Sequence, residues 1–219
     1  MQNLADLPYI DDAARDRLTV EGDDALTYLQ SQIAQEIRDM AVGETRWTLV
    51  LEPAGKVDSL ARITRTAEAT FVLDTDAGFG APLQARIDRF KIRVKAESRL
   101  TPAERSAPSA DHEAARIAAG WPRMGAEIVP GETVPAVTGV IAVSVNFTKG
   151  CYPGQELVER MDSRGADAPK SLRIIDVPAG TAVGTVIDDV AEVTSVDGDR
   201  ALAYVKRGND LGTAPTHSN

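Results

Sequence analysis

The chain has 219 residues, of which 43% are hydrophobic and 26% charged, as in a soluble globular protein with one large or two to three small domains. Its formal net charge of −9 argues against direct nucleic-acid binding, and no apolar run approaches the roughly eighteen residues of a membrane span. The single cysteine excludes an internal disulfide framework, and the polar start at Met1 does not resemble a signal peptide, so we expect a cytoplasmic protein.

The N-terminal part predicts a strand followed by a long helix. Residues 17–20 alternate as a short strand does, and Gly22 closes it. Asp23 is the expected N-cap of a helix in which apolar residues recur at helical spacing as far as Met40. Gly43 is expected to end this helix, whose glutamine-rich face we expect to be solvated.

The next stretch predicts a hairpin, a third strand and a second helix. Residues 46–51 and 57–65 flank a Pro-Ala-Gly turn, and residues 71–74 form the third strand. Residues 82–90 fit a helix whose last residue, a phenylalanine, points inward. Residues 91–97 alternate again and predict a further strand with its lysines and arginines on one face.

The middle of the chain is poorer in regular structure. Residues 98–111 have the composition of a loop, and a short helix over 111–119 is stopped by Gly120. Residues 125–137 are rich in turn formers, and residues 140–147 alternate as a strand does.

The C-terminal part predicts strands only. Residues 164–169 resemble a linker, and the tail from Gly208 is expected to be disordered. Between them lie short strands around an Asp-Gly turn, which favour a small barrel or sandwich, over residues 172–177, 184–187, 190–196 and 201–205.

One run carries most of the functional signal: Lys149-Gly150-Cys151-Tyr152-Pro153-Gly154-Gln155-Glu156. Two glycines and a proline predict a tight turn from a strand into a helix, with Cys151 at or just before the helix N-terminus. The helix dipole and Lys149 would both favour the reactive thiolate. The alternative is that Cys151 is an inert, buried, small hydrophobic residue.

This run resembles the signature of the YgfZ-type folate-binding proteins, relatives of the glycine-cleavage aminomethyltransferase (T-protein), which reads Lys-Gly-Cys-Tyr-x-Gly-Gln-Glu. Other stretches resemble the same family in the same order, at residues 22–32, 53–57, 116–120, 160–165 and 184–204. The resemblance implies an α+β, T-protein-like fold with mixed or antiparallel sheets and a small C-terminal β-barrel. It also implies four segments: 1–46 and 139–166 as a discontinuous first domain, 47–138 as an α+β second domain, and 167–219 as the barrel.

The resemblance further implies a tetrahydrofolate derivative as ligand and no metal. Iron–sulfur cluster enzymes or assembly proteins would be the partners, and tRNA modification would depend on them. Cys151 and Lys149 would carry the chemistry, and the residues that line the site would be Tyr152, Gly154, Gln155, Glu156, Arg116, Trp121 and Arg160.

The chain departs from the family where a pterin would be held. The acid expected after Arg116-Ile117 is Ala118, and Pro82 stands where the aspartate of the aminomethyltransferase would fall. A carboxylate normally accepts two N–H bonds from a pterin. Aminomethyl transfer is therefore not expected, and the chain is not expected to be a conventional enzyme.

Three functions stay open from the sequence. The first is an accessory protein for iron–sulfur proteins that acts through Cys151, the second is an interaction module with a degenerate folate site, and the third is a folate-dependent one-carbon transferase. Either tryptophan could stack on a pterin or pack in the core. The basic segment 84–105 is either a solvated face or an anion site, and His217 is expected at the surface.

Overall fold

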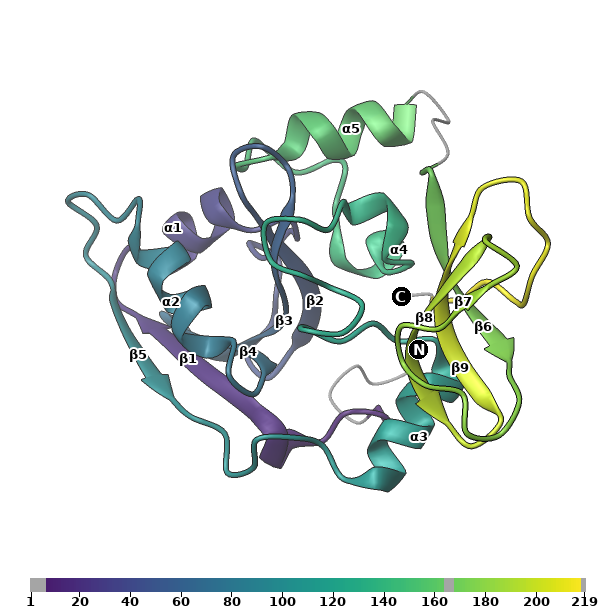
Figure 1. Cartoon of the computed structure of the whole chain (residues 1–219). Helices are drawn as coiled ribbons and strands as arrows, with labels where there is room; N and C mark the ends of the chain where they lie inside the picture. The colour runs from purple at the N-terminus through teal and green to yellow at the C-terminus, as the bar shows by residue number, and fades with distance from the viewer. Residues whose placement is uncertain (1–6, 164–167, 218–219) are drawn as a thin grey trace.

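The computed structural model describes residues 7–163 and 168–217, and these form an α+β protein built on two antiparallel sheets (Figure 1). The larger sheet has the strand order β2-β3-β4-β1-β5, and the smaller, curled sheet has the order β6-β9-β8-β7. The strands of the larger sheet are β1 Arg15–Glu21, β2 Thr45–Leu51, β3 Val57–Ala67, β4 Thr70–Asp76 and β5 Glu97–Thr101. Those of the smaller sheet are β6 Lys170–Asp176, β7 Val186–Ile187, β8 Ala191–Asp197 and β9 Arg200–Lys206.

The helices lie around these sheets (Figure 1). They are η1 Asp12–Ala14, α1 Ala25–Gln32, α2 Gly80–Asp88, α3 Ala110–Ala119, η2 Pro135–Val137, α4 Ile141–Ser144 and α5 Gln155–Ser163. None of the helices in the described ranges is both long and apolar enough to cross a bilayer.

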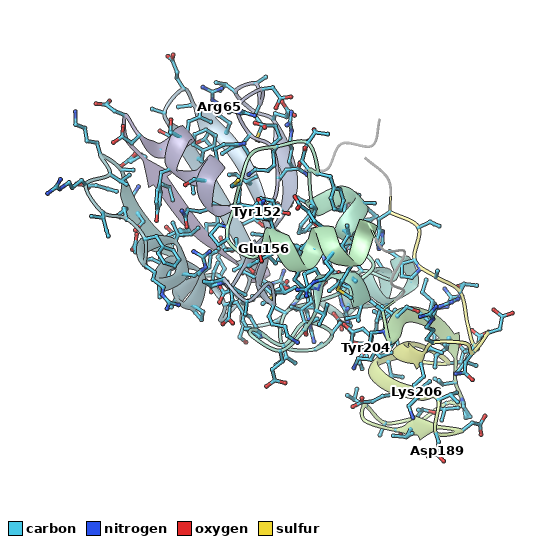
Figure 2. The ribbon with its side chains drawn as sticks, turned by 90° about the horizontal axis from the view of Figure 1, so that it is seen from above. Arg65, Tyr152, Glu156, Asp189, Tyr204 and Lys206 are labelled. Carbon is cyan, nitrogen blue, oxygen red and sulfur yellow. The ribbon has the colours of Figure 1, made fainter. Side chains whose placement is uncertain are left out.

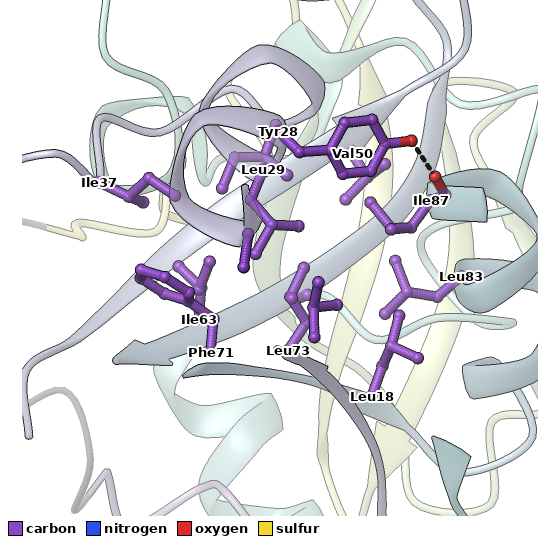
Figure 3. Close-up of a cluster of buried hydrophobic side chains, with 14 of the residues drawn as sticks. Leu18, Tyr28, Leu29, Ile37, Val50, Ile63, Phe71, Leu73, Leu83 and Ile87 are labelled. Carbon is purple, nitrogen blue, oxygen red and sulfur yellow. Dashed lines mark hydrogen bonds between the residues drawn. The ribbon is translucent and has the colours of Figure 1, made fainter. Parts of the chain in front are cut away.

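Alternation along the strands divides the larger sheet between two cores. Val50 on β2 packs with α1 and α2, while its neighbours Leu49 and Leu51 point to the opposite face. Figure 3 shows the first core, where Leu29 and Leu83 from the two helices meet the sheet and the Tyr28 hydroxyl donates to the Ile87 carbonyl. The second core lies under α4 and α5, which places the signature turn on this face.

The predicted fold class, the hairpin, the third strand and the strands of the smaller sheet are confirmed. The short helix before Gly120 is also confirmed, and Gly120 caps it in the left-handed conformation. Strand β1 lies in the same sheet as β2–β5, so the expected first and second segments share a sheet. The four-segment division itself stays a prediction, and most of the expected linker over 164–169 lies outside the described residues.

The first helix is eight residues long, and its predicted extension to Met40 is wrong. At Ile33 the backbone becomes extended and bridges to Val50, and the next N–H, that of Ala34, donates to the Leu49 carbonyl. The chain therefore pairs with the end of β2 while Ile37 and Met40 still bury their side chains. The expected N-cap, Asp23, is also wrong, because Asp24 occupies that position.

The strand predicted over 91–97 is absent, and β5 begins where it was expected to end. Helix α2 ends at Asp88, so Phe90 lies beyond it and is partly exposed, with Arg86 and Arg89 over its ring. Ile92, which the alternation would place on the face opposite the basic residues, is 79% exposed.

Two further predictions are wrong. Residues 140–147 contain the short helix α4 and no strand. The prediction failed because the pattern of a short apolar run cannot distinguish a buried helix from a buried strand. The tail is ordered as far as the structure describes it: the Thr213 N–H donates to the Ile174 carbonyl, and the Thr213 carbonyl accepts from the Ile174 N–H, each at 2.9 Å.

The β7–β8 hairpin turns through two aspartates in an unfavourable conformation. Asp188 and Asp189 have φ of 48° and 57°, and the Val190 N–H donates to the Ile187 carbonyl at 2.9 Å, as in a type I′ turn. Asp189 lies at the far end of the smaller sheet (Figure 2). Asn-Gly is the pair that favours this turn.

Replacing Asp188→Asn together with Asp189→Gly should therefore stabilise the protein by about 1 kcal/mol, because the strain at two positive φ angles is relieved. Thermal unfolding should show a rise of roughly 2–4 °C. Asp176→Asn, at an exposed strand position, is the control for charge removal alone. An unchanged or lowered midpoint for the double variant would show that the aspartates are not strained.

Candidate functional site

The signature run forms a surface turn that packs against the β2–β3 hairpin and leads into α5. Gly154 has φ of +83°, and a Cβ there would lie 2.5 Å from the Glu52 carbonyl oxygen and 2.9 Å from the Cα of Gly55. Gly55 has φ of +85°, and a Cβ there would collide with Leu157. Both glycines are required because two backbones touch at this point.

Tyr152 and Gln155 fix the turn on the side of the helix. The Tyr152 N–H donates to the Gln155 Oε1 at 2.9 Å, which ties the turn to the first residue of α5. The Tyr152 side chain is 8% exposed and belongs to the second core, and burial together with the charge of Glu159 raises its pKa to about 12. Figure 2 shows Tyr152 and Glu156 at the start of α5.

Lys149 fixes the turn on its other side. Its ammonium donates to the backbone carbonyls of Gln30, Ile33 and Gln35 at 2.7, 2.5 and 3.0 Å. These three bonds use all three N–H groups of the amine. Desolvation by burial lowers the pKa of Lys149 to about 8, although the charge of Glu36 opposes this shift. Lys149 therefore joins the signature turn to the chain that leaves α1.

Cys151 lies between these fixed points and is exposed. Helix α5 begins at Gln155, so the expected start of the helix at or just after the cysteine is displaced along the chain. A reachable thiol on a turn that is held on both sides can react with a partner molecule. The three N–H groups of Lys149 all donate to backbone carbonyls. The expectation that Lys149 favours the thiolate form of Cys151 stays a prediction.

The expected site residues do not form one cluster. Glu156 and Arg160 are exposed on α5, whereas Arg116 and Trp121 lie on α3 and in the loop after it. Trp121 lines a cavity of about 580 Å³ and, together with Arg116, a neighbouring one of about 20 Å³. No residue of the signature run lines either cavity.

Arg116 is a structural residue at the junction of the two sheets. It is 4% exposed, and its five N–H groups are all used within the protein. The acceptors are Glu113, Glu127, Ser195 and the Trp121 carbonyl. Burial would lower the pKa of Arg116, but the hydrogen bonds with Glu113 and the charge of Glu127 raise it. No donor is left on this guanidinium for a ligand.

The larger cavity has aromatic walls. The Trp121 ring centroid lies 4.4 Å from that of Trp47, 5.3 Å from that of Tyr9 and 4.8 Å from that of His217. The expected surface position of His217 is wrong, because the tail brings its ring against Trp121 and half-buries it. Sequence reasoning did not find Tyr9, and its position beside a tryptophan more than a hundred residues away carries no local signal.

The basic segment does not form a site with this cavity. Arg86 is buried, and its guanidinium donates to the Leu51 carbonyl and to the Gln32 side chain. Arg89, Arg93 and Lys95 are exposed, and none of them lines either of the two cavities. In the described part of the chain, no group of three or more His, Cys, Asp or Glu side chains could hold a metal ion.

Comparison with known proteins defines the fold. The structure is similar to the crystal structure of glycine cleavage system aminomethyltransferase T from Bartonella henselae, with a TM-score of 0.72 and 14% sequence identity over 90% of this chain and 77% of that one. The chain is also 25% identical to an uncharacterized protein of Haemophilus influenzae, over 68% of this chain and 67% of that protein. No family model matches. The chain therefore has the T-protein fold, as the resemblance implied.

Gly154→Ala should destabilise the protein by more than about 2 kcal/mol, because a methyl group would meet the Glu52 carbonyl and the backbone of Gly55. Gly150→Ala is the matched control in the same turn: its Cβ would have no atom within 4 Å, so it should change stability by less than about 0.5 kcal/mol. Urea unfolding measures both. Equal effects would contradict the close contact of the two turns.

Lys149→Met should cost about 2–4 kcal/mol, since three carbonyls lose their donor. Lys56→Met removes a single exposed bond to the Glu132 carbonyl and should cost under about 1 kcal/mol. If Lys149 serves the fold, the rate at which Cys151 reacts with an aromatic disulfide reagent at fixed pH should change less than about two-fold. A much slower reaction in a folded Lys149→Met protein would instead assign the lysine to the thiol.

Proposed function

We propose that this chain is an accessory protein of the folate-binding type that supports the assembly or repair of iron–sulfur clusters, and thereby tRNA modification, through the thiol of Cys151. The observation that carries the proposal is the exposure of Cys151 on a turn held by Lys149, Tyr152 and Gln155. A structural cysteine would be buried in the core.

The thiol acts on a partner protein. One cysteine cannot hold a cluster, because iron–sulfur clusters need about four ligands. The step that a single exposed thiol supports is exchange: the Cys151 thiolate attacks one sulfur of a partner disulfide, forms a mixed disulfide and releases the other sulfur as a thiolate. Iron–sulfur enzymes or their assembly proteins are the proposed partners.

A tetrahydrofolate derivative is the ligand that the family resemblance implies. The aromatic rings around Trp121 suit a flat ring, but none of the described residues that line the cavity carries a carboxylate to accept the N–H bonds of a pterin. The residues present therefore do not fit folate in the way a carboxylate site would, and no step is derived through it. The same lack of an acid on the cavity wall argues against aminomethyl transfer.

The second candidate is an interaction module with a degenerate folate site. Ala118 favours it, because this alanine lines the cavity and is exposed at the position where the resemblance would place the pterin-binding acid. The two candidates differ in their need for the thiol.

Cys151→Ala tests this difference. In cells that lack the native chain, it should abolish the recovery of iron–sulfur enzyme activity, while the purified variant keeps the thermal midpoint of the native protein because the side chain is exposed. Thr148→Ala, another exposed position of the same loop, is the control and should restore activity fully. Full restoration by Cys151→Ala would leave the interaction module as the function.

A further inference from the structure

The cavity beside Trp121 has the size and fixed walls of a small-molecule site. Its volume of about 580 Å³ falls within the range of roughly 300–1,000 Å³ that ligand pockets occupy. It lies between residues 7–9, helix α3 and the C-terminal tail. The tail is fixed by the paired bonds of Thr213 with Ile174 and by Pro215, which packs against Gly120.

Aromatic rings from three separate parts of the chain meet at this cavity. Tyr9 comes from the N-terminal segment, Trp121 from the loop after α3, and His217 from the tail. The Tyr9 and His217 rings are only half-buried. A flat ring bound beside Tyr9 and His217 would stack on the exposed parts of these two rings.

The described side chains that line the cavity are uncharged. Among the residues that the structure describes they include no aspartate, glutamate, lysine or arginine, and their polar groups are the hydroxyls of Tyr9, Thr213 and Thr216, the imidazole of His217 and the indole N–H groups of Trp47 and Trp121. In the described part of the chain these three hydroxyls have no hydrogen-bond partner. Burial raises the pKa of Tyr9 to about 12 and lowers that of His217, so both groups are neutral near pH 7.

The uncharged wall disfavours two kinds of ligand: one that carries a charge, and one that presents an amidine group, as a pterin does. A charge brought into the cavity would lose water without gaining a counter-charge, and an amidine edge would find no carboxylate. Carbonyl oxygens, in contrast, accept well from the hydroxyl groups on the cavity wall.

We propose that this cavity binds an uncharged, planar ring that carries carbonyl oxygens, of the isoalloxazine or quinone type, in preference to a pterin. The inference deepens the proposed function by naming the ligand class of the accessory protein, and it does not depend on Cys151.

Equilibrium dialysis of the full chain against riboflavin and against 5-formyltetrahydrofolate tests the preference. Quenching of tryptophan fluorescence is a second readout, because both tryptophans of the chain line the cavity. Riboflavin should bind at one site per chain with a Kd at least ten-fold lower than that of the folate. Equal affinities, tighter folate binding, or no riboflavin binding at 100 µM, about the weakest affinity of interest for such a site, would each overturn the inference.

Ala118→Glu should reverse the preference for riboflavin over the folate. A carboxylate on the cavity wall should weaken riboflavin at least ten-fold and strengthen the folate by a similar factor. Ala110→Glu, exposed on the same helix but outside the cavity, is the matched control and should change neither. If Ala118→Glu fails to fold, His217→Ala, which removes a ring from the tail, should weaken riboflavin alone; an unchanged Kd there would also overturn the inference.

Cys151→Ala separates this inference from the proposed function. It should bind riboflavin as the native protein does, even though it fails in cells. Loss of riboflavin binding in folded Cys151→Ala would show that the ligand sits at the signature turn and not in this cavity.

Discussion

The buried ion pair between Arg116 on α3 and Glu127 in the following loop ties that helix and loop to the smaller sheet, and the position of the cavity depends on it. The Glu127 side chain is fully buried and accepts hydrogen bonds from Arg116 and from the hydroxyls of Thr194 and Ser195 on β8, while its carbonyl accepts from Tyr204 on β9. The net contribution of such a buried pair to the free energy of folding is small. Removal of one partner is nevertheless strongly destabilising, because the other would be left as an uncompensated buried charge. Because Arg116 also donates to the Trp121 carbonyl, the pair places the aromatic wall of the cavity as well.

The local part of this fold could be predicted from the sequence, and the errors occur where distant segments compete with a local pattern. The hairpin and the C-terminal strands follow from alternation and turn residues. The apolar spacing after α1 continues to Met40, yet the backbone at Ile33 leaves the helix to pair with β2. The tail has the composition of a disordered segment, but the main chain of Ile174 offers it a partner. Periodicity records which side chains are buried and does not record which backbone groups find partners.

At the candidate site, too, the local features could be predicted from the sequence and the contacts with distant segments could not. The sequence places a cysteine among turn-forming residues, and this is enough to predict an exposed thiol; Gly154 is also explained, although the backbone that it contacts could not be foreseen. The contacts of Lys149 were beyond sequence reasoning, because its three acceptors lie more than a hundred residues away along the chain. Proximity in sequence favoured an interaction between Lys149 and its near neighbour Cys151, whereas three carbonyls at the end of a distant helix offer the ammonium a more complete set of acceptors.

The thiol turn and the cavity are connected by one rigid element, strand β2. Trp47, at one end of the strand, lines the cavity, and Leu51, at the other, lies against the turn at Gly154. Between them, Thr48 accepts from the Gln35 N–H, in the segment whose carbonyls hold Lys149. The strand is paired with β3 from Thr45 to Leu51, with one register shift between Val50 and Leu51. A ligand beside Trp47 could affect Cys151 through this strand only if β2 shifted within the sheet, and its pairing with β3 resists such a shift. The fold therefore favours two sites that work independently: the T-protein architecture supplies the framework, and the side chains of this chain decide the chemistry at each site.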